Sequence, residues 1–513
     1  MLLKRINYLL ITIILIIVYM HIGTGLYSDD FVYLNNVPNW TLSSLKILWS
    51  RPEYYLNIPL FLFYFVQLYL IDKNFILYDL IKIIVLLFSL LLTYRFLVDY
   101  ISKYRAILIA VLFILYPIHD ATNYCPINQY QVITAVLVMY AHTLINAERY
   151  FAGLFAGLFA SFFSYASPPM VFGLSIIFLL KKNYKRFTLF ILPQFIYISY
   201  FYVMKPIVGV NTIRTEHVTN PIKYLKFYML QVLTGLDVAI GPSFFLKVYY
   251  SIVNLSLHSA VIGCVTVYIF YRFVEIKKEP INVALFWGVV AIMPLTFGMF
   301  ALTGYYPQMA FGLGNRVTTL YSLTLSFLVI FFFMQNKWIS TAVFIIFIFS
   351  VLGISDHWKA WNKHQMSVIN NIRNNRQLQD YKGDKVIFVS GNQYSKYGKL
   401  SHIEFFSEHW VPNAVFRLAL DRNDVTAMAI NKRFKYINGQ LVDAKYKHEI
   451  NINDYINVYD SEKDVLLKID ADGINSYISS LPLDTRHWIQ MLGRDNVIKK
   501  IILYLMPRLE YAL

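Results

Sequence analysis

Eleven long apolar stretches dominate this chain of 513 residues and restrict the folds that it can adopt. Charged residues make up only 15% of the sequence, whereas a soluble globular domain has about 25%. Because about 20 apolar residues are enough for a helix to cross a bilayer, the chain is predicted to be a polytopic α-helical membrane protein. The stretches cover residues 6–22, 75–97, 106–118, 127–145, 151–165, 167–180, 187–204, 247–271, 281–303, 317–334 and 338–355.

Lysine and arginine are concentrated between these stretches. Lys4 and Arg5 precede the first one, and cytoplasmic loops of membrane proteins carry an excess of basic residues. We therefore predict eleven transmembrane helices, a cytoplasmic N-terminus and an outer C-terminus. The same pattern accounts for the net charge of +16, so we predict membrane lipids and no nucleic acid as partners. The basic joints are residues 95–105, 146–149, 181–186, 272–278 and 335–337.

For two apolar segments, length alone does not decide whether they cross the membrane. Residues 151–180 are uncharged and are interrupted at Ser167-Pro168-Pro169, and because proline breaks helices we interpret them as a hairpin. Residues 53–71 are apolar but rich in tyrosine, which favours an interfacial or re-entrant helix. These interpretations leave a first outer loop at about 23–74 and a second at about 205–246.

The composition changes after residue 355. Residues 1–355 form the predicted membrane module, whereas residues 356–513 carry many charges of both signs and several glycine-containing turn signals. This second region is predicted to be a soluble α/β domain on the outer face. Its patterns predict strands at 385–390 and 457–468 and amphipathic helices at 401–420 and 497–508.

Two adjacent aspartates, Asp29 and Asp30, follow the first apolar stretch. Ionisable residues at a membrane face tend to be functional, solvated or paired, because charge beside lipid is costly. Neighbouring side chains of an extended chain point in opposite directions, so one of the two is expected to face a site. Such a carboxylate serves either as a general base for an acceptor hydroxyl or as a ligand of a divalent metal, Mg²⁺ or Mn²⁺. A solvated acidic pair or a helix N-cap explains the same residues.

Other candidate residues lie on the same predicted side of the membrane. His119 and Asp120 end the third apolar stretch, where the alternative is a capped helix end. Arg316 precedes a later stretch, and arginine binds phosphate in a bidentate fork, although snorkelling to lipid headgroups is an alternative. Asp79 and Lys82 lie three residues apart and are predicted to pair with each other.

These motifs resemble the GT-C superfamily of membrane glycosyltransferases, particularly the protein O-mannosyltransferase-like branch that uses polyprenyl-phosphate sugars. The likeness covers residues 1–355 and depends mainly on the first 125. The chain departs from the family pattern at Asp79, where the family has histidine, and at Ser167-Pro168-Pro169, which replaces a Lys-Glu element. The matching positions are Asp29-Asp30, Trp49, Arg51-Pro52, Tyr78, Pro117-Ile-His119-Asp120 and Asn315-Arg316.

The resemblance implies transfer of a sugar from a polyprenyl-phosphate donor to a glycan, lipid or protein acceptor, with inversion at the anomeric carbon. One of Asp29 or Asp30 would be the base, with Asp29 favoured, and Arg51, His119, Asp120 and Arg316 would bind substrate. The expected location is a bacterial inner membrane, with the site facing outward. A flippase or transporter of lipid-linked glycans is the alternative from another class, and a glycan polymerase or ligase is a second one.

Overall fold

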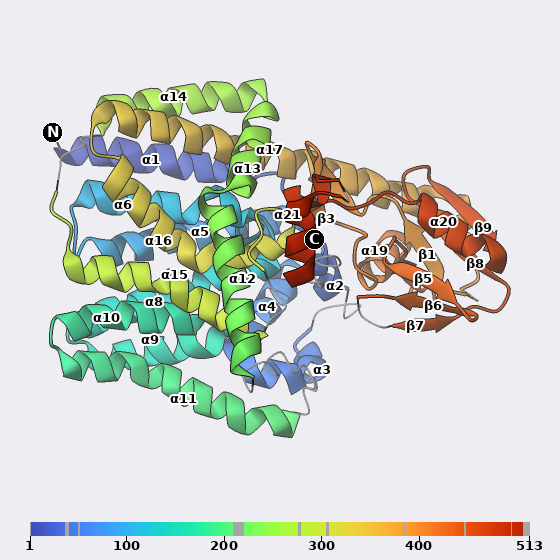
Figure 1. Ribbon diagram of the computed structural model, residues 1–513, viewed down its shortest axis with the longest axis horizontal. Helices are drawn as coiled ribbons and strands as arrows, with labels where there is room; N and C mark the ends of the chain where they lie inside the picture. Colours follow the sequence, from blue (N-terminus) through green and yellow to red (C-terminus); the bar gives the residue numbers. More distant parts are fainter. Residues whose placement is uncertain are drawn as a thin grey trace. The chain divides into compact units, whose positions relative to one another are not determined.

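The computed structural model describes residues 2–35, 41–49, 52–208, 220–274, 279–303, 307–383, 385–445, 448–493 and 495–505. The chain divides into two compact units (Figure 1). The first unit comprises Met1–Gly25, Asn39–Ala310 and Gly314–Asp356, and the second comprises Leu26–Pro38, Phe311–Leu313 and His357–Leu513. The segment that carries Asp29 and Asp30 therefore belongs to the same unit as the C-terminal region, which the sequence did not indicate.

The first unit is helical. Short 3₁₀ or π turns lie between its helices, at η1 (Pro52–Asn57), η2 (Pro117–His119), η3 (Pro126–Asn128), η5 (Leu313–Thr318) and η6 (Val329–Phe333). The helices are α1 (Leu2–His21), α3 (Ser44–Trp49), α4 (Ile58–Ile71), α5 (Phe75–Leu97), α6 (Lys103–Ile114), α7 (Asp120–Tyr124), α8 (Tyr130–Asn146), α9 (Tyr150–Phe163), α10 (Ser167–Leu180), α11 (Tyr184–Val208), α12 (Pro221–Ile240), α13 (Pro242–Val253), α14 (Leu257–Phe273), α15 (Val283–Thr303), α16 (Thr319–Leu328) and the first part of α17 (Lys337–Asn374).

Among the described residues, eight helical segments are long and apolar enough to cross a membrane. The class of membrane protein is thus supported, while the predicted count of eleven spans is not confirmed. The eight are Tyr54–Ile71, Phe75–Leu97, Lys103–Tyr124, Tyr184–Ile207, Pro221–Val253, Val283–Leu302, Leu313–Phe333 and Lys337–Asn374.

The difference between the eight segments found and the eleven spans predicted has local causes. Helices α9 and α10 are separate, as the hairpin interpretation expects, but each has 14 residues, short of the usual ~20 for a span. Pro168 and Pro169 lie in the first turn of α10, where a missing backbone donor costs little. Tyr54–Ile71, which we interpreted as interfacial, meets the length and composition of a span. Residues 221–253, which include much of the predicted second outer loop, are helical.

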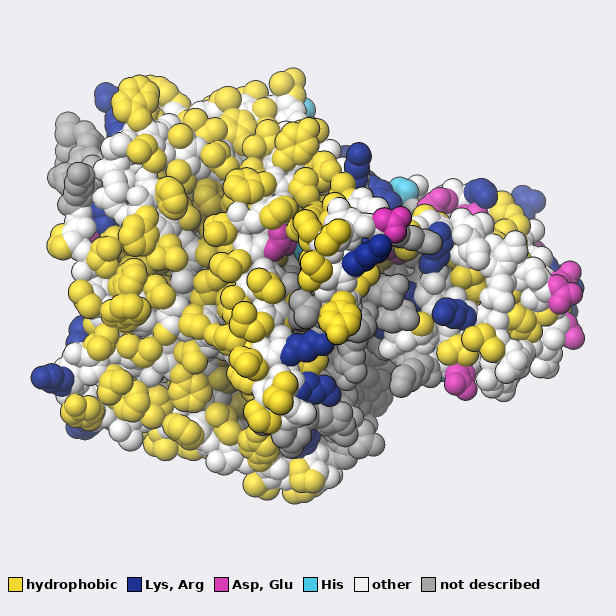
Figure 2. Space-filling view, in the orientation of Figure 1, with side chains coloured by type: hydrophobic (Ala, Val, Ile, Leu, Met, Phe, Trp, Pro, Cys, Tyr) yellow, Lys and Arg dark blue, Asp and Glu magenta, His cyan; other side chains and the backbone are white. Residues whose placement is uncertain are grey.

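Large apolar side chains remain exposed along the helices of the first unit. Figure 2 shows them spread over much of the visible helical surface, and they include Ile76, Phe151, Ile222 and Leu257, each 79% exposed or more. A soluble protein rarely exposes a continuous apolar surface of this extent, so the surface fits a lipid environment.

A buried ion pair of α5 forms hydrogen bonds to the segment that follows α1. Lys82 Nζ lies 2.7 Å from Asp79 Oδ1, which confirms the predicted pair. The Asp79 carboxylate also accepts hydrogen bonds from the backbone nitrogens of Gly23 and Gly25, at 2.8 and 3.0 Å. Lys82 donates to the Gly25 carbonyl at 2.7 Å. The pair thus satisfies backbone groups of a turn as well as each other.

The second unit contains three small sheets. The largest has the strand order β4-β1-β8-β9, in which β1 is parallel to β4 and β8, and β8 and β9 are antiparallel. The strands are β1 (Ile387–Ser390), β2 (Tyr394–Tyr397), β3 (Leu400–Glu404), β4 (Ala427–Ala429), β5 (Phe434–Ile437), β6 (Gln440–Asp443), β7 (Glu449–Asn451), β8 (Tyr455–Asp460) and β9 (Val465–Asp470). The helices are α2 (Asp29–Leu34), the end of α17, α18 (Arg376–Gln379), α19 (Val411–Leu420), α20 (Ile474–Ser480) and α21 (Val497–Leu505), with 3₁₀ turns η7 (Ala471–Gly473) and η8 (Trp488–Met491).

In the C-terminal region, the sequence patterns predicted the types of the helices and strands better than the residues at which they begin and end. The strand expected at 385–390 is β1, and the helix expected at 497–508 is α21 over its described part. The single strand expected at 457–468 is a hairpin, with Asp464 at a φ of 55° in the turn. Residues 401–404 belong to β3, and the helix there begins only at Val411.

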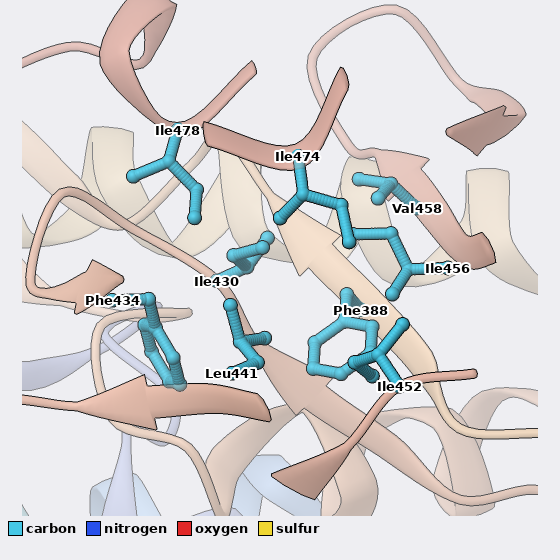
Figure 3. Packing of buried hydrophobic residues seen from close by; sticks show 9 residues of the cluster. All are labelled: Phe388, Ile430, Phe434, Leu441, Ile452, Ile456, Val458, Ile474 and Ile478. Atoms are coloured by element: carbon cyan, nitrogen blue, oxygen red, sulfur yellow. The ribbon is translucent and has the colours of Figure 1, made fainter. Parts of the chain in front are cut away.

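An apolar core holds the second unit together. Figure 3 shows Phe388 and Val458 of the largest sheet facing Leu441 of β6 and Ile474 of α20. All four side chains are at most 2% exposed, and burying one side chain of this size contributes about 1.5–3 kcal/mol. The core thus combines strands of two sheets with a helix that follows them in sequence.

Candidate functional site

Asp30 closes the turn that enters α2. Its Oδ2 accepts a hydrogen bond from the Tyr27 backbone nitrogen at 2.9 Å, and the residue is 6% exposed. Ser28, which lies between Tyr27 and Asp30 in the sequence, adopts a φ of 45°. This value is uncommon for a residue with a side chain. The Tyr27 hydroxyl donates to the Trp358 carbonyl at 2.8 Å. Asp30 therefore has the contacts of a residue that shapes the backbone.

Asp29 is the more accessible of the two aspartates. It is half-buried, and its Oδ1 accepts a hydrogen bond from Trp410 Nε1 at 2.8 Å. Helix α2 packs on α19, which begins directly after Trp410, and Phe31 contacts Phe405 with ring centroids 6.0 Å apart. In the described part of the chain no cation pairs with Asp29. The carboxylate is thus oriented by a neutral donor.

A second carboxyl, Glu404 at the end of β3, lies in the electrostatic neighbourhood of Asp29. Burial raises the pKa of the Glu404 carboxyl, the charges of Glu408 and Asp29 act in the same direction, and Arg486 opposes them. Arg486 Nη1 lies 3.6 Å from Glu404 Oε1. The second unit thus brings the carboxyl groups of Asp29 and Glu404 into the same neighbourhood.

Glu408 is buried and forms the centre of an ionic group next to Glu404. Lys445 Nζ lies 2.7 Å from its Oε1, and Arg433 Nη2 lies 3.2 Å from its Oε2. Burial by itself would raise the pKa of Glu408, but the charges of Arg433 and Lys445 outweigh burial and lower it to about 2. Arg433 also donates to the Ser407 carbonyl at 2.7 Å. The group ties the segment after β3 to β5 and to the end of β6.

In the first unit, Asp120 is fully buried in an ion pair. Its Oδ1 accepts hydrogen bonds from Lys247 Nζ, at 3.0 Å, and from Asn315 Nδ2. Asp120 is 2% exposed and Lys247 is 0% exposed. The preceding His119 is also buried, and its Nε2 donates to the Phe113 carbonyl at 2.8 Å. Both residues have the contacts of structural residues.

Asn315 and Thr318 attach the segment of Arg316 to the turn around Asp120. Asn315 Oδ1 accepts from the Ala121 backbone nitrogen at 3.1 Å, and Thr318 Oγ1 donates to the Ile118 carbonyl at 3.0 Å. These bonds join η5 to the turn at η2. Arg316, which follows Asn315 in sequence, is half-buried.

We expect that replacing Lys247 with methionine destabilises the first unit. The change leaves the Asp120 charge buried without its cation, which typically costs about 3–5 kcal/mol. The midpoint of thermal unfolding in detergent should therefore fall. The double variant Lys247→Met/Asp120→Asn removes both charges and should recover much of the loss. Equal midpoints for the single variant and the unmodified protein would contradict the ion pair.

Comparison with protein-family models, curated proteins and solved structures found no match. The resemblance to the GT-C superfamily therefore stays a prediction that depends on the motifs of the sequence.

The predicted site residues divide between the two units. Asp29 and Asp30 belong to the second unit, His119, Asp120 and Arg316 belong to the first, and Arg51 lies outside the described residues. Within the described ranges there is no group of three or more histidine, cysteine, aspartate or glutamate residues that could hold a metal ion. Sequence reasoning missed Trp410 and Glu404, because nothing near them in sequence points to their partners.

Proposed function

We propose that this protein is a membrane glycosyltransferase that transfers a sugar from a polyprenyl-phosphate donor to a glycan, lipid or protein acceptor. The observation that carries the proposal is the difference between the two aspartates of the family-like pair. Asp30 is committed to the Tyr27 backbone nitrogen, whereas Asp29 is half-exposed and is oriented by the neutral Trp410 indole. Asp29 is therefore the residue suited to be a general base.

The reaction would be a displacement at the anomeric carbon. The acceptor oxygen forms the new bond as the bond to the phosphate oxygen breaks, the electron pair leaves with the phosphate, and the acceptor proton moves to Asp29. A positioned base of this kind contributes about 10²- to 10⁴-fold to a rate. In the first unit, Arg316 stays a sequence-based candidate for binding a phosphate group, because a guanidinium matches phosphate geometry and charge.

The surface of the first unit supports a donor of this kind. Its exposed apolar side chains suit an environment in which a polyprenyl tail dissolves. Location in a bacterial inner membrane, with the second unit on the outer face, is part of the same proposal.

The test is reconstitution of the purified full-length protein in proteoliposomes with a radiolabelled polyprenyl-phosphate sugar. We expect label to pass to an added acceptor, and the new linkage to have the anomeric configuration opposite to that of the donor. Movement of the labelled lipid between leaflets without any transfer would instead indicate a flippase. Transfer with retained configuration would contradict the single-displacement mechanism.

A further inference from the structure

The second unit contains a pocket of about 410 Å³, which lies between α17 and the segment that follows β1. Its volume is within the range of about 300–1,000 Å³ that is usual for small-molecule sites. Its wall includes Ala360, Trp361, Gln393, Lys396, Glu462 and Asp484.

Two histidines of α17 fix the pocket wall. His357, Trp361 and His364 have helical spacing and share one face of the helix. His357 Nε2 is hydrogen-bonded to Ser395 Oγ at 2.8 Å, and His364 Nε2 donates to Asn392 Oδ1 at 2.7 Å. Asn392 Nδ2 in turn donates to the Ser461 carbonyl at 2.9 Å. The loop opposite the helix is thus attached on either side of Trp361.

Trp361 is a preorganised aromatic surface in this wall. Its indole stacks on the His364 ring, with centroids 4.8 Å apart and an interplanar angle of 28°. An aromatic side chain held in this way loses little conformational entropy when a ligand binds. The indole can therefore offer an apolar face to a ligand.

The charged groups of the wall disfavour an anionic ligand. Exposed Lys396 and Glu462 carry opposite charges and half-buried Asp484 adds a further carboxyl, so the wall lacks the excess of cations that a phosphate site needs. The Lys396 ammonium can donate and the carboxylates of Glu462 and Asp484 can accept, and a hydroxyl group can act as the partner of either kind.

We propose that this pocket binds a sugar residue of a neutral oligosaccharide. A pyranose ring has a face of C–H groups, which would pack on Trp361, and a rim of hydroxyls, which would bond to the polar wall. Aromatic surface combined with a few polar groups is the usual composition of such sites. That the oligosaccharide is the acceptor of sugar transfer rests on the proposed function, whereas binding in this pocket does not.

Binding is tested on the full-length protein in nanodiscs without any donor, by titration calorimetry with cellotetraose and chitotetraose. Trp361→Ala is expected to weaken binding by about 10-fold or more, as for other aromatic anchors. Ala360→Phe fills the pocket from an exposed helical position without removing a native contact, and it should have a similar effect. Ser367→Phe, at an exposed position of the same helix outside the pocket wall, is the matched control and should bind normally.

Three outcomes would overturn the site. They are failure of the unmodified protein to bind either oligosaccharide, unchanged binding by both pocket variants, and displacement of the sugar by inorganic phosphate. Because the assay contains no donor, its result is independent of the transferase. Sugar transfer that persists without oligosaccharide binding would remove this pocket and leave the proposed function intact.

Discussion

Replacement of Asp29 by asparagine is expected to lower the rate of sugar transfer by about 10²- to 10⁴-fold, the contribution of a general base. The amide keeps the size of the side chain and can still accept the Trp410 hydrogen bond, but it cannot take a proton. The measurement is the initial rate of label transfer from a polyprenyl-phosphate sugar in proteoliposomes, at equal protein levels.

Asp30→Asn should keep most of the activity, because an amide oxygen can still accept from the Tyr27 backbone nitrogen. Asp30→Ala leaves that buried nitrogen unpaired, which costs about 1–3 kcal/mol, and should therefore lower stability. Asp472→Asn, at an exposed aspartate of the same unit, is the matched control for handling and folding. Full activity of Asp29→Asn together with loss of activity in Asp30→Asn would reverse the assignment.

Replacement of Glu408 by glutamine is expected to destabilise the second unit by about 3 kcal/mol at neutral pH. The change removes the carboxylate that Arg433 and Lys445 share, and leaves the Arg433 side chain, which is only 15% exposed, without its anion. Breaking a buried pair typically costs about 3–5 kcal/mol. The lowered pKa of Glu408 in the folded protein implies a contribution of the same order of magnitude to the free energy of unfolding. The measurement is denaturant unfolding of the full-length protein in detergent, followed by tryptophan fluorescence.

This effect should depend on pH in a defined direction. The folded protein lowers the pKa of Glu408 from 4.5 to about 2, so the stabilisation is fully present above about pH 4.5 and is lost as the pH falls towards 2. The difference between Glu408→Gln and the unmodified protein should shrink over the same interval. Glu449→Gln, at an exposed glutamate of β7, should show no such difference at any pH. A difference that stays constant down to pH 2 would contradict the ion pair.

The sequence was most informative where the relevant physics is local. Apolar length alone indicated a membrane protein, because a helix satisfies its own backbone hydrogen bonds wherever it lies in lipid. The Asp79–Lys82 pair followed from a spacing of three residues on one helix, which places the two side chains side by side. The strand β1 and the helix α21 were likewise visible in their own residues.

The candidate site could be predicted only in part. The sequence pointed to Asp29 and Asp30 together but gave no basis in their own residues for choosing between them. The choice depends on Trp410, which is 381 positions from Asp29, and on the backbone turn that uses Asp30. Asp120 also depends on distant residues, but in its case they argue against a role in the site. Lys247 and Asn315 hold it in a buried cluster that no local sequence pattern predicts.

By itself, then, the sequence determined the class of protein, the helical nature of its long apolar stretches and the pair of aspartates worth testing. Only the tertiary structure decided that this pair belongs to the same compact unit as the C-terminal region, that Asp29 is the accessible carboxylate, and that His119 and Asp120 are buried. The physical reason is that hydrophobicity and helix formation are properties of short segments. The exposure and hydrogen bonding of a carboxylate are instead set by groups that folding brings from hundreds of residues away.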